Sequence, residues 1–379
     1  MRIAIDCTSL LGSYQTGADK YILNLVHGLG KTGGSNQYTL FFYASTRTRR
    51  EMLEKRKKEF TYGNFDFKSI HFHQLGFEIL WDKFHLNYPR IENFTGPVDI
   101  FHAPGYRVTL AKAPAIMTIY DLTRMKLKGV FRPEISAHFE ALVKNSVKRA
   151  SHIIAISQST KNDIIELLGI SPDKITVIYC GSNPGFYRME NNPLQEPAAR
   201  PYMLCVATSL GQNKNLETLI NAFELAKRKH KLPHNLVISG RKTSEYEKLL
   251  AHAARLGMAD SVTFTGYVSE NELLRLYNGA EFFVFPSKYE GFGLPVLEAM
   301  SCGLPVIASN SSSLPEIAGD AALMASPDSV DELAEAMNRI ASDASLRKML
   351  SERSILQARK FSWEKTVSET LQLYNRLNS

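Results

Sequence analysis

The sequence predicts an α/β protein built from two doubly wound parallel sheets. Short apolar segments of strand length alternate with amphipathic segments of helix length through both halves of the chain, which is typical of βαβ units. The 379 residues exceed the usual size of one core, and the hydrophobic content of 44% is enough to bury two. We therefore expect two domains of ordinary size.

Runs of β-branched and aromatic residues predict the strands. In the first half we expect them at 3–7, 38–43, 70–72, 100–102, 116–120, 153–156 and 175–179. In the second half we expect them at 203–207, 236–239, 262–265, 282–285, 306–309 and 322–324.

Helical spacing and capping residues predict the elements between these strands. Apolar residues recur at helical spacing from Leu216 to Phe223, and Ser269 with Glu272 has the pattern of a capping box. The same pattern recurs at Ser329 with Glu332, and the segment 363–377 is expected to be an amphipathic helix with Val367, Leu371, Tyr374 and Leu377 on one face. The domain boundary is expected between Gly185 and Arg200, where Pro and Asn interrupt any regular pattern.

The net charge of +7 predicts an anionic partner. Seven Arg and Lys residues fall within residues 47–58, a segment that suits either an anionic membrane surface or a solvated helix face. The chain shows no nucleic-acid-binding motif, so we expect no nucleic-acid partner. The four cysteines are widely separated and are expected to be buried, reduced side chains.

The most informative segment is 290–298. Glu290 and Glu298 flank two glycines, directly after the apolar run 282–285. Gly291 and Gly293 allow a ligand to approach the backbone closely, and a helix that starts at this point favours an anion at its N-terminus. Carboxylates accept hydrogen bonds from the hydroxyls of a sugar. The segment therefore predicts a site for a phosphorylated sugar, although two solvated glutamates beside a turn would have the same pattern.

The sequence Glu-Gly-Phe-Gly-Leu-Pro-Val-Leu-Glu at 290–298, within a longer match over 262–324, resembles the donor half of glycosyltransferase family 4. These are retaining transferases of the GT-B fold. Shorter matches extend the resemblance over nearly the whole chain, at Gly17, His102, Asp121, Lys214, Ser362 and Trp363.

The resemblance implies a fold and an activity. The fold would be two Rossmann-like domains facing a cleft, with residues 1–190 for the acceptor, 191–360 for the donor, and a C-terminal helix in 361–379 returning to the first domain. The activity would be retaining transfer of a hexose such as mannose from a nucleoside-diphosphate-sugar to a glycan or a polyprenyl-linked acceptor, in surface polysaccharide or lipopolysaccharide biosynthesis. No cofactor or metal is implied, and we expect a cytoplasmic protein that contacts the inner face of the cell membrane.

The resemblance also implies roles for individual residues. Glu290 would orient the transferred sugar and Glu298 would bind the ribose. Lys214, at the start of a helix, would meet the diphosphate; the preceding 208–213 has no second cation. The remaining donor contacts are backbone groups, at Gly17 for the phosphate, at Tyr267 and Val268 for the nucleobase, and at Gly291, Phe292, Gly293 and Leu294 beside the donor.

The catalytic assignments rest on two residues of the first half besides Glu290. Asp121 ends a predicted strand and could accept a proton from the acceptor hydroxyl. Relatives carry His before this Asp, whereas this chain has Tyr120, so the base stays open. His102 also ends a strand and could serve the acceptor or be a core histidine. The chain shows no evident side chain that would form a covalent bond to the sugar. Retention therefore suggests that the acceptor attacks the anomeric carbon from the face from which the leaving group departs.

The residues alone leave two other hypotheses open for the function of this site. A nucleotide-sugar epimerase or hydrolase could use Glu290 or Asp121 as an acid or base. A non-catalytic sensor could bind the same donor without turnover. A dehydrogenase fits less well, because no Gly-x-Gly-x-x-Gly opens either half.

Overall fold

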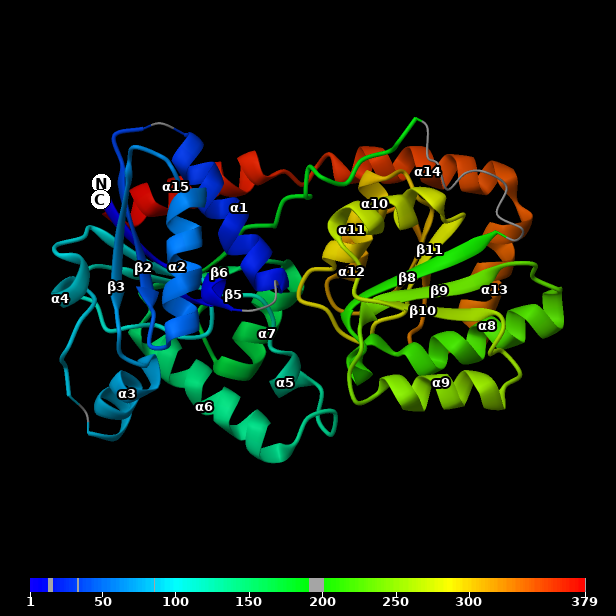
Figure 1. Ribbon diagram of the computed structural model, residues 1–379, viewed down its shortest axis with the longest axis horizontal. Helices are drawn as coiled ribbons and strands as arrows, with labels where there is room; N and C mark the ends of the chain where they lie inside the picture. The colour runs from blue at the N-terminus through cyan, green and yellow to red at the C-terminus, as the bar shows by residue number, and fades with distance from the viewer. Residues whose placement is uncertain (13–15, 33, 85, 191–200, 379) are drawn as a thin grey trace. The chain divides into compact units, whose positions relative to one another are not determined.

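The computed structural model describes residues 1–12, 16–32, 34–84, 86–190 and 201–378. The chain forms two compact units, and each is described by itself (Figure 1). Unit 1 consists of Met1–Gly181 with Trp363–Ser379, and unit 2 is Ser182–Ser362. The expected boundary at 190/191 adjoins residues 191–200, which lie outside the described residues.

Unit 1 is built on a sheet of seven parallel strands in the order β3-β2-β1-β4-β5-β6-β7. The central strands are buried along their whole length and mostly apolar on both faces, as a sheet covered by helices on both sides requires. The strands are β1 (Arg2–Asp6), β2 (Gln37–Tyr43), β3 (Phe65–Ile70), β4 (Ile100–Ala103), β5 (Ala115–Ile119), β6 (His152–Ala155) and β7 (Ile175–Val177).

The expectation of a strand at 70–72 was wrong, because that strand ends where we expected it to begin. β3 covers Phe65–Ile70 and lies at the edge of the sheet. Its sequence alternates Phe65, Asp66, Phe67 and Lys68, so only one face is apolar. An edge strand is only partly covered, and the apolar runs that predicted the other strands are therefore missing here.

The helices of unit 1 follow the strands as expected for βαβ units. α1 begins at Gly17, since Thr16 caps it: the Asp19 amide donates to Thr16 Oγ1 at 3.3 Å, and the Thr16 amide donates to the Asp19 carboxylate at 2.9 Å. The helices are α1 (Gly17–Lys31), α2 (Arg47–Glu59), α3 (Gln74–Glu78) with a π-helical turn at Ile79–Lys83, α4 (Glu92–Thr95), α5 (Thr123–Lys126), α6 (Pro133–Arg149), α7 (Gln158–Leu168) and α15 (Trp363–Asn378). Single 3-10 turns lie at Thr8–Leu11 and Pro172–Lys174.

The C-terminal helix α15 packs within unit 1 beside α1, as predicted (Figure 1). The Tyr374 hydroxyl lies 2.6 Å from Nδ1 of the buried His102 in β4, and the Thr366 hydroxyl donates to the carbonyl of Tyr179. The buried face differs from the predicted one. Leu371 and Leu377 are only partly buried, and the covered side chains are Trp363, Thr366, Val367, Thr370, Leu373 and Tyr374.

Unit 2 is built on a sheet of six parallel strands in the order β10-β9-β8-β11-β12-β13. Each expected strand is present. The strands are β8 (Tyr202–Ser209), β9 (Asn235–Arg241), β10 (Val262–Gly266), β11 (Phe282–Phe285), β12 (Val306–Ser309) and β13 (Ala322–Ala325).

The predicted helix signals of unit 2 are largely confirmed. Ser269 and Glu272 form a complete capping box. Ser329 accepts from the Glu332 amide, but the Glu332 carboxylate accepts from the Ser326 amide instead, so the second box is only half formed. The helices are α8 (Leu216–His230), α9 (Tyr246–Arg255), α10 (Glu270–Gly279), α11 (Leu294–Ser301), α12 (Leu314–Ala318), α13 (Val330–Ser342) and α14 (Ala344–Ala358), with a 3-10 turn at Gln212–Lys214. The apolar face of α8 is buried in the core of the unit.

The strand order reverses once in each sheet. In unit 1 the reversal lies between β1 and β4, and in unit 2 it lies between β8 and β11. The loops leaving the carboxyl ends of two such strands diverge to opposite faces of the sheet, which is where doubly wound sheets bind ligands. The fold therefore directs attention to the loops after these four strands.

The residue that caps the start of α11 is Gly293, and its backbone conformation and close packing disfavour any residue with a side chain. Gly293 has φ of +106°, and a Cβ at this position would lie 2.6 Å from Cδ2 of Leu314. Pro295 follows within the first turn, where its fixed φ suits a helix and no amide is needed. Both residues fix the point at which the chain turns from loop into helix.

We predict that Gly293→Ala destabilises unit 2 more than Gly257→Ala does. Both positions have positive φ, which disfavours alanine by about 1–2 kcal/mol. Gly257 has open space around it, whereas the methyl group at 293 meets Leu314, which should add at least about 1 kcal/mol. Calorimetric unfolding of the two variants measures the difference, and equal destabilisation would contradict this account.

We also predict that acid destabilises unit 1 through His102. Burial lowers the pKa of His102 from 6.5 to about 3. Between these values the unfolded chain binds a proton that the folded chain does not, so stability falls as the pH drops below 6.5. Both tryptophans, Trp81 and Trp363, lie in unit 1, and their fluorescence can follow its unfolding in urea. The wild type should lose about 2 kcal/mol more than His102→Gln between pH 7 and pH 5. A similar loss in both proteins would show that His102 is not responsible.

Candidate functional site

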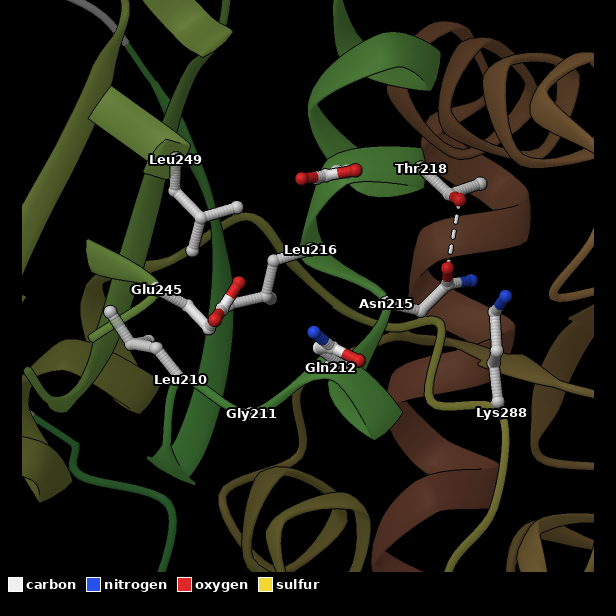
Figure 2. Close-up of a pocket in the computed structure, with 10 residues that line it drawn as sticks. Leu210, Gly211, Gln212, Asn215, Leu216, Thr218, Glu245, Leu249 and Lys288 are labelled. Atoms are coloured by element: carbon white, nitrogen blue, oxygen red, sulfur yellow. Dashed lines mark hydrogen bonds between the residues drawn. The ribbon is translucent and has the colours of Figure 1, made fainter. Parts of the chain in front are cut away.

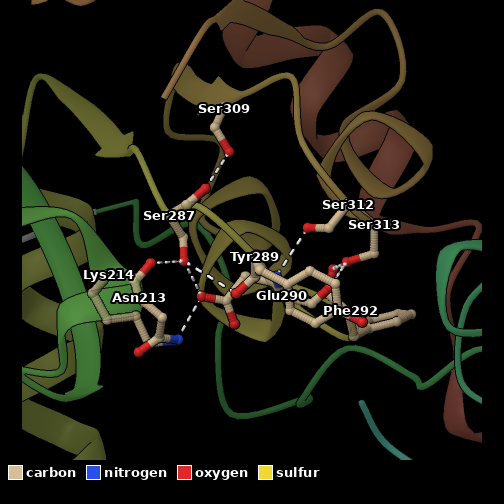
Figure 3. Close-up of polar contacts among 9 residues, drawn as sticks. All are labelled: Asn213, Lys214, Ser287, Tyr289, Glu290, Phe292, Ser309, Ser312 and Ser313. Carbon is tan, nitrogen blue, oxygen red and sulfur yellow. Dashed lines mark hydrogen bonds and ion pairs between the residues drawn. The ribbon is translucent and has the colours of Figure 1, made fainter. Parts of the chain in front are cut away.

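Two loops meet at the reversal of the strand order in unit 2. The loop after β8 carries Lys214, and the loop after β11 carries Glu290. Lys214 Nζ donates to Glu290 Oε1 at 2.5 Å (Figure 3). The two residues are 76 positions apart, and the parallel pairing of β8 with β11 brings them together. The structure thus joins the two residues that the sequence assigned to the diphosphate and to the sugar.

Hydrogen bonds fix the position of the Glu290 carboxylate. Ser287 Oγ lies 2.5 Å from Glu290 Oε1 and 3.0 Å from the carbonyl oxygen of Asn213. The amide of Lys288 donates to the same carbonyl at 2.9 Å. These contacts join the loop after β11 to the loop after β8. Glu290 and Lys214 are therefore kept close by hydrogen bonds between their loops as well as by their own ion pair.

A run of serines after β12 holds the backbone around Glu290. The Glu290 amide donates to Ser312 Oγ at 2.9 Å. Ser313 Oγ lies 3.0 Å from the Glu290 carbonyl and 2.8 Å from that of Phe292 (Figure 3). Ser312 adopts a positive φ of 53°, which is uncommon outside glycine. The loops that shape this site therefore follow β8, β11 and β12, which are neighbours in the sheet.

The ion pair is largely shielded from water. The side chains of Lys214 and Glu290 are 15% and 13% exposed, and the ammonium also lies 5.6 Å from the centre of the Phe285 ring. An attraction between charges is stronger where water is excluded. The thiol of Cys205 lies near enough to respond to both charges, but burial is the main cause that raises its pKa to about 12. That thiol stays neutral.

Glu298 lies in the second turn of α11 and is 5% exposed. Its carboxylate accepts a hydrogen bond at 3.1 Å from the hydroxyl of the buried Tyr277 in α10. Burial, with the charge of Glu298 as the next cause, holds the pKa of Tyr277 well above its usual value. The tyrosine is therefore a donor that fixes Glu298 in place.

The segment between the two glutamates is closely packed. Gly291, Phe292 and Gly293 are buried, and the Phe292 ring lies edge-on to Phe361 at 5.9 Å. Leu294 is partly exposed at the start of α11. The glycines thus bring the backbone, and not a side chain, to the N-terminus of α11.

Tyr267 and Val268 follow β10, two strands away from β8. The Tyr267 side chain is 75% exposed, and Val268 is partly buried. They lie at the same carboxyl edge of the sheet as the ion pair. Their assignment to the nucleobase stays a prediction.

The loop before Lys214 also borders a pocket of about 260 Å³ (Figure 2). Its walls come from the start of α8, from α9 and from Lys288 in the loop after β11. Asn215 lies between the 3-10 turn and α8. Its side-chain nitrogen donates to the carbonyls of Pro286 and Pro327, and its side-chain oxygen accepts from the Thr218 hydroxyl. Asn215, with a φ of 60°, therefore fixes the start of α8 next to Lys214.

The residues of unit 1 that the sequence singled out lie on three different elements. Gly17 is the first residue of α1, directly after the cap Thr16. Asp121 follows β5, and its carboxylate accepts a hydrogen bond from the Thr123 amide at 2.9 Å. The Asp121 amide donates to the hydroxyl of Tyr106 at 3.2 Å. Asp121 is partly exposed, whereas His102, the other candidate catalytic residue in this unit, is completely buried.

Tyr120, which directly precedes Asp121, is a structural side chain. Its hydroxyl donates to the carbonyl of Pro104 at 2.9 Å, and its ring lies edge-on to Tyr21 of α1 at 5.4 Å. Burial holds the pKa of Tyr120 well above its usual value. It stays protonated at neutral pH and is not a base.

His102 lies in the interior of unit 1 with no exposed surface. Its Nδ1 meets the Tyr374 hydroxyl at 2.6 Å, and its Nε2 meets the Thr118 hydroxyl at 2.8 Å. Both ring nitrogens are therefore engaged by neighbouring strands and by α15. The assignment of His102 to catalysis stays a prediction, and the contacts observed here are those of a core histidine.

The sequence reasoning missed the serines that surround Glu290. The run Ser311, Ser312 and Ser313 directly follows β12 and so could have been noticed as a polar segment at the ligand-binding edge. Ser287 and Asn213 gave no such signal, because their role depends on the two loops meeting. No cluster of three or more His, Cys, Asp or Glu side chains suited to a metal ion occurs within the described residues.

Two family profiles cover most of the chain. The profile described as "Glycosyltransferase Family 4" matches residues 16–186, and the profile described as "Glycosyl transferases group 1" matches residues 189–357. The first therefore covers most of unit 1 and the second most of unit 2.

Individual proteins agree with this assignment. The chain is 29% identical over 288 residues to the O-antigen chain mannosyltransferase B of Escherichia coli, covering 73% of this chain and 74% of that protein. It is 33% identical over 239 residues to the serotype-specific mannosyltransferase WbdA of Escherichia coli, covering 61% of this chain but only 29% of that protein. The solved structure of Anabaena HepE in complex with UDP and glucose shares the fold, with a TM-score of 0.73, 17% identity and 99% of each chain covered. The chain is a GT4-family glycosyltransferase of glycosyl transferases group 1, with the GT-B arrangement of two Rossmann-like sheets and a C-terminal helix that packs on the N-terminal unit.

Proposed function

We propose that this enzyme transfers a hexose, with retention at the anomeric carbon, from a nucleoside-diphosphate-sugar to a glycan or lipid-linked acceptor in surface polysaccharide biosynthesis. The observation that carries the proposal is the shielded pair of Lys214 and Glu290 at the reversal of the strand order in unit 2. A cation and a carboxylate side by side match the two parts of such a donor, its diphosphate and its sugar hydroxyls.

In this proposal the donor replaces the contact between Lys214 and Glu290. The ammonium turns to the diphosphate, and the carboxylate accepts hydrogen bonds from the sugar. Ser287 and Ser312 keep Glu290 in position while Lys214 moves away. The leaving group is a diphosphate whose charge increases as the glycosidic bond breaks, and a prearranged cation stabilises it most in the transition state.

The start of α11 would complete the donor site. Gly291 and Gly293 carry no side chain at this helix start, and the N-terminus of α11 carries a partial positive charge that favours a phosphate. Glu298 would bind the ribose hydroxyls, and Tyr277 holds its carboxylate for that purpose. The chemistry proposed here uses neither a metal ion nor a bound cofactor.

Unit 1 would bind the acceptor, with Asp121 as the group that takes up the proton of the attacking hydroxyl. Its carboxylate is fixed by the Thr123 amide and is partly exposed. Glu290 would orient the sugar without forming a bond to it. Attack on the same face as the departing diphosphate then retains the anomeric configuration.

Mannose is the sugar we propose, because the two curated relatives described above are named as mannosyltransferases. The donor base is a separate question: HepE was solved with UDP, and its low identity carries the fold and not the choice of nucleotide. A thermal-shift comparison of UDP, GDP, ADP and their sugars on this chain identifies the base, since a ligand that binds only the folded state raises its unfolding temperature.

The same donor site would serve an epimerase, a hydrolase or a non-catalytic sensor. Incubation with the donor alone separates these functions from transfer. Rapid turnover of the donor without acceptor indicates an epimerase if the product is another nucleotide-sugar and a hydrolase if nucleotide is released. A ligand-induced thermal shift with no product under any acceptor indicates a sensor. We expect slow release that accelerates when acceptor glycan is added.

We propose that the enzyme works at the inner face of the cell membrane. No helix within the described residues is long and apolar enough to cross a bilayer. The basic segment forms α2, whose side chains pair within the helix as Arg47–Glu51, Lys57–Glu54 and Arg56–Glu59. Only Leu53 of α2 is buried. Contact of α2 with anionic lipid stays a prediction, and such a contact would be electrostatic and sensitive to salt.

We predict that Lys214→Ala and Glu290→Gln each lower kcat/KM by about 10²- to 10³-fold. Lys214→Ala should also abolish the thermal shift caused by the nucleoside diphosphate, whereas Glu290→Gln should retain it, because its role is with the sugar. Lys248→Ala is the matched control, since Lys248 forms an exposed pair with Glu245 in the same unit. A Lys214→Ala protein with wild-type activity would remove this residue from the site.

We predict that Asp121→Asn lowers the transfer rate by about 10²- to 10⁴-fold while donor binding is unchanged. Asparagine can still accept the hydrogen bond from the Thr123 amide, so the local turn should survive. The measurement compares the transfer rate with the thermal shift by the donor nucleotide. Transfer at the wild-type rate would show that another group takes the proton.

A further inference from the structure

Unit 1 carries two adjoining hollows along one face of helix α6. The first, of about 330 Å³, lies between α6 and the residues Arg107 and Arg124. The second, of about 190 Å³, lies between α6 and the α3 region. His138 and Leu142 of α6 line both, so the two hollows form one groove, which we term the α6 groove. Figure 1 shows α6 between α3 and α5.

Part of the wall of the α6 groove consists of apolar side chains that remain exposed. Leu75, Ile79 and Ile135 are 43%, 45% and 45% exposed, and Leu142 is half-buried beside them. Ile135, His138 and Leu142 are spaced three and four residues apart and therefore share one face of α6. Phe139, which also lines the first hollow, and Val143 are buried in the core of the unit.

One end of the groove carries two arginines, and Lys83 lines the other hollow. Arg124 forms no ion pair with the described residues, and its guanidinium lies over the rings of Phe131 and Phe139, at 5.9 and 5.3 Å. Arg107 lines the same hollow and pairs with the buried Glu78. The acids of the groove are otherwise Asp82, which pairs with Arg149, and the exposed Glu134.

The charged end also adjoins the predicted catalytic acid. Phe139 of the groove packs edge-on against Tyr106, with ring centres 4.8 Å apart. The Tyr106 hydroxyl in turn accepts a hydrogen bond from the Asp121 amide. Arg124 is three residues beyond Asp121, at the start of α5. A molecule in the groove would therefore place its charged end towards Asp121 and its apolar part towards α3.

We propose that the α6 groove binds an amphiphile in which a hydrocarbon chain ends in a phosphate group. The chain lies on Leu75, Ile79, Ile135 and Leu142, and the phosphate pairs with Arg124, which stacks on aromatic rings and is free to make a charged, bidentate contact. This inference rests on the proposed function, for which the groove would hold the lipid part of the acceptor. It is an assignment to unit 1 alone and requires nothing of the donor site.

Binding to the full chain can be measured by calorimetry with farnesyl phosphate, below its aggregation concentration. Farnesol and inorganic phosphate test the two parts of the ligand separately, and vesicles with and without phosphatidylglycerol test a bilayer as the source of the same chemistry. The groove variants are Arg124→Gln and Ile135→Ser. Their matched controls in unit 2 are Arg339→Gln, at an exposed arginine, and Leu356→Ser, at a leucine that is 60% exposed.

We expect farnesyl phosphate to bind, and farnesol and phosphate to bind at least about tenfold more weakly. Each groove variant should weaken binding by about tenfold, and the control variants should leave it unchanged. Absence of farnesyl phosphate binding, equal binding by the groove variants, or binding to anionic vesicles alone would each overturn the proposal. Circular dichroism confirms that every variant is folded.

The same samples distinguish this inference from the proposed function. If the donor nucleotide still raises the unfolding temperature but farnesyl phosphate does not bind, the groove assignment fails and the transferase proposal stands. If farnesyl phosphate binds as predicted but no nucleotide or nucleotide-sugar shifts the unfolding temperature, the groove assignment stands and the donor site is wrong.

Discussion

The contact between Lys214 and Glu290 is the constraint on which the candidate site of unit 2 depends. Removing one partner of a shielded ion pair leaves a charge without compensation, so the two loops have to be placed together and held. The structure does so with neutral groups: Ser287 and Asn213 join the loops, and Ser312 holds the backbone of Glu290. The donor of the proposed function would then displace the lysine while the carboxylate keeps its position.

The reversal of strand order explains why the site residues of each unit gather at one edge. In unit 2 the loops after β8 and β11 are joined by the contacts of Lys214 with Glu290 and of Ser287 with Asn213, and the serines after β12 hold the backbone around Glu290. In unit 1 the corresponding edge carries the start of α1 after β1 and Asp121 after β5. Two units with the same topology thus present different chemistry, a cation and acids in unit 2 and an acid beside an apolar groove in unit 1.

The sequence predicted the strands where they are buried on both faces, because such strands are continuous apolar runs. It failed at β3, whose alternating pattern belongs to an edge strand. It also placed Leu371 and Leu377 on the buried face of α15, where Thr366 and Thr370 are covered instead. Those threonines are buried because the hydroxyl of Thr366 donates to Tyr179 and that of Thr370 to Thr366, partners that no periodicity in the sequence contains.

The family and the two parallel sheets could be predicted from the sequence, and so could the candidate acids and lysine, since strand periodicity and a specific local motif both lie in consecutive residues. Only the tertiary structure decided that Lys214 contacts Glu290, that Tyr277 fixes Glu298 and that His102 is enclosed by Thr118 and Tyr374. These are contacts between residues far apart in the chain, and their geometry follows from strand order and side-chain packing, which local sequence does not encode.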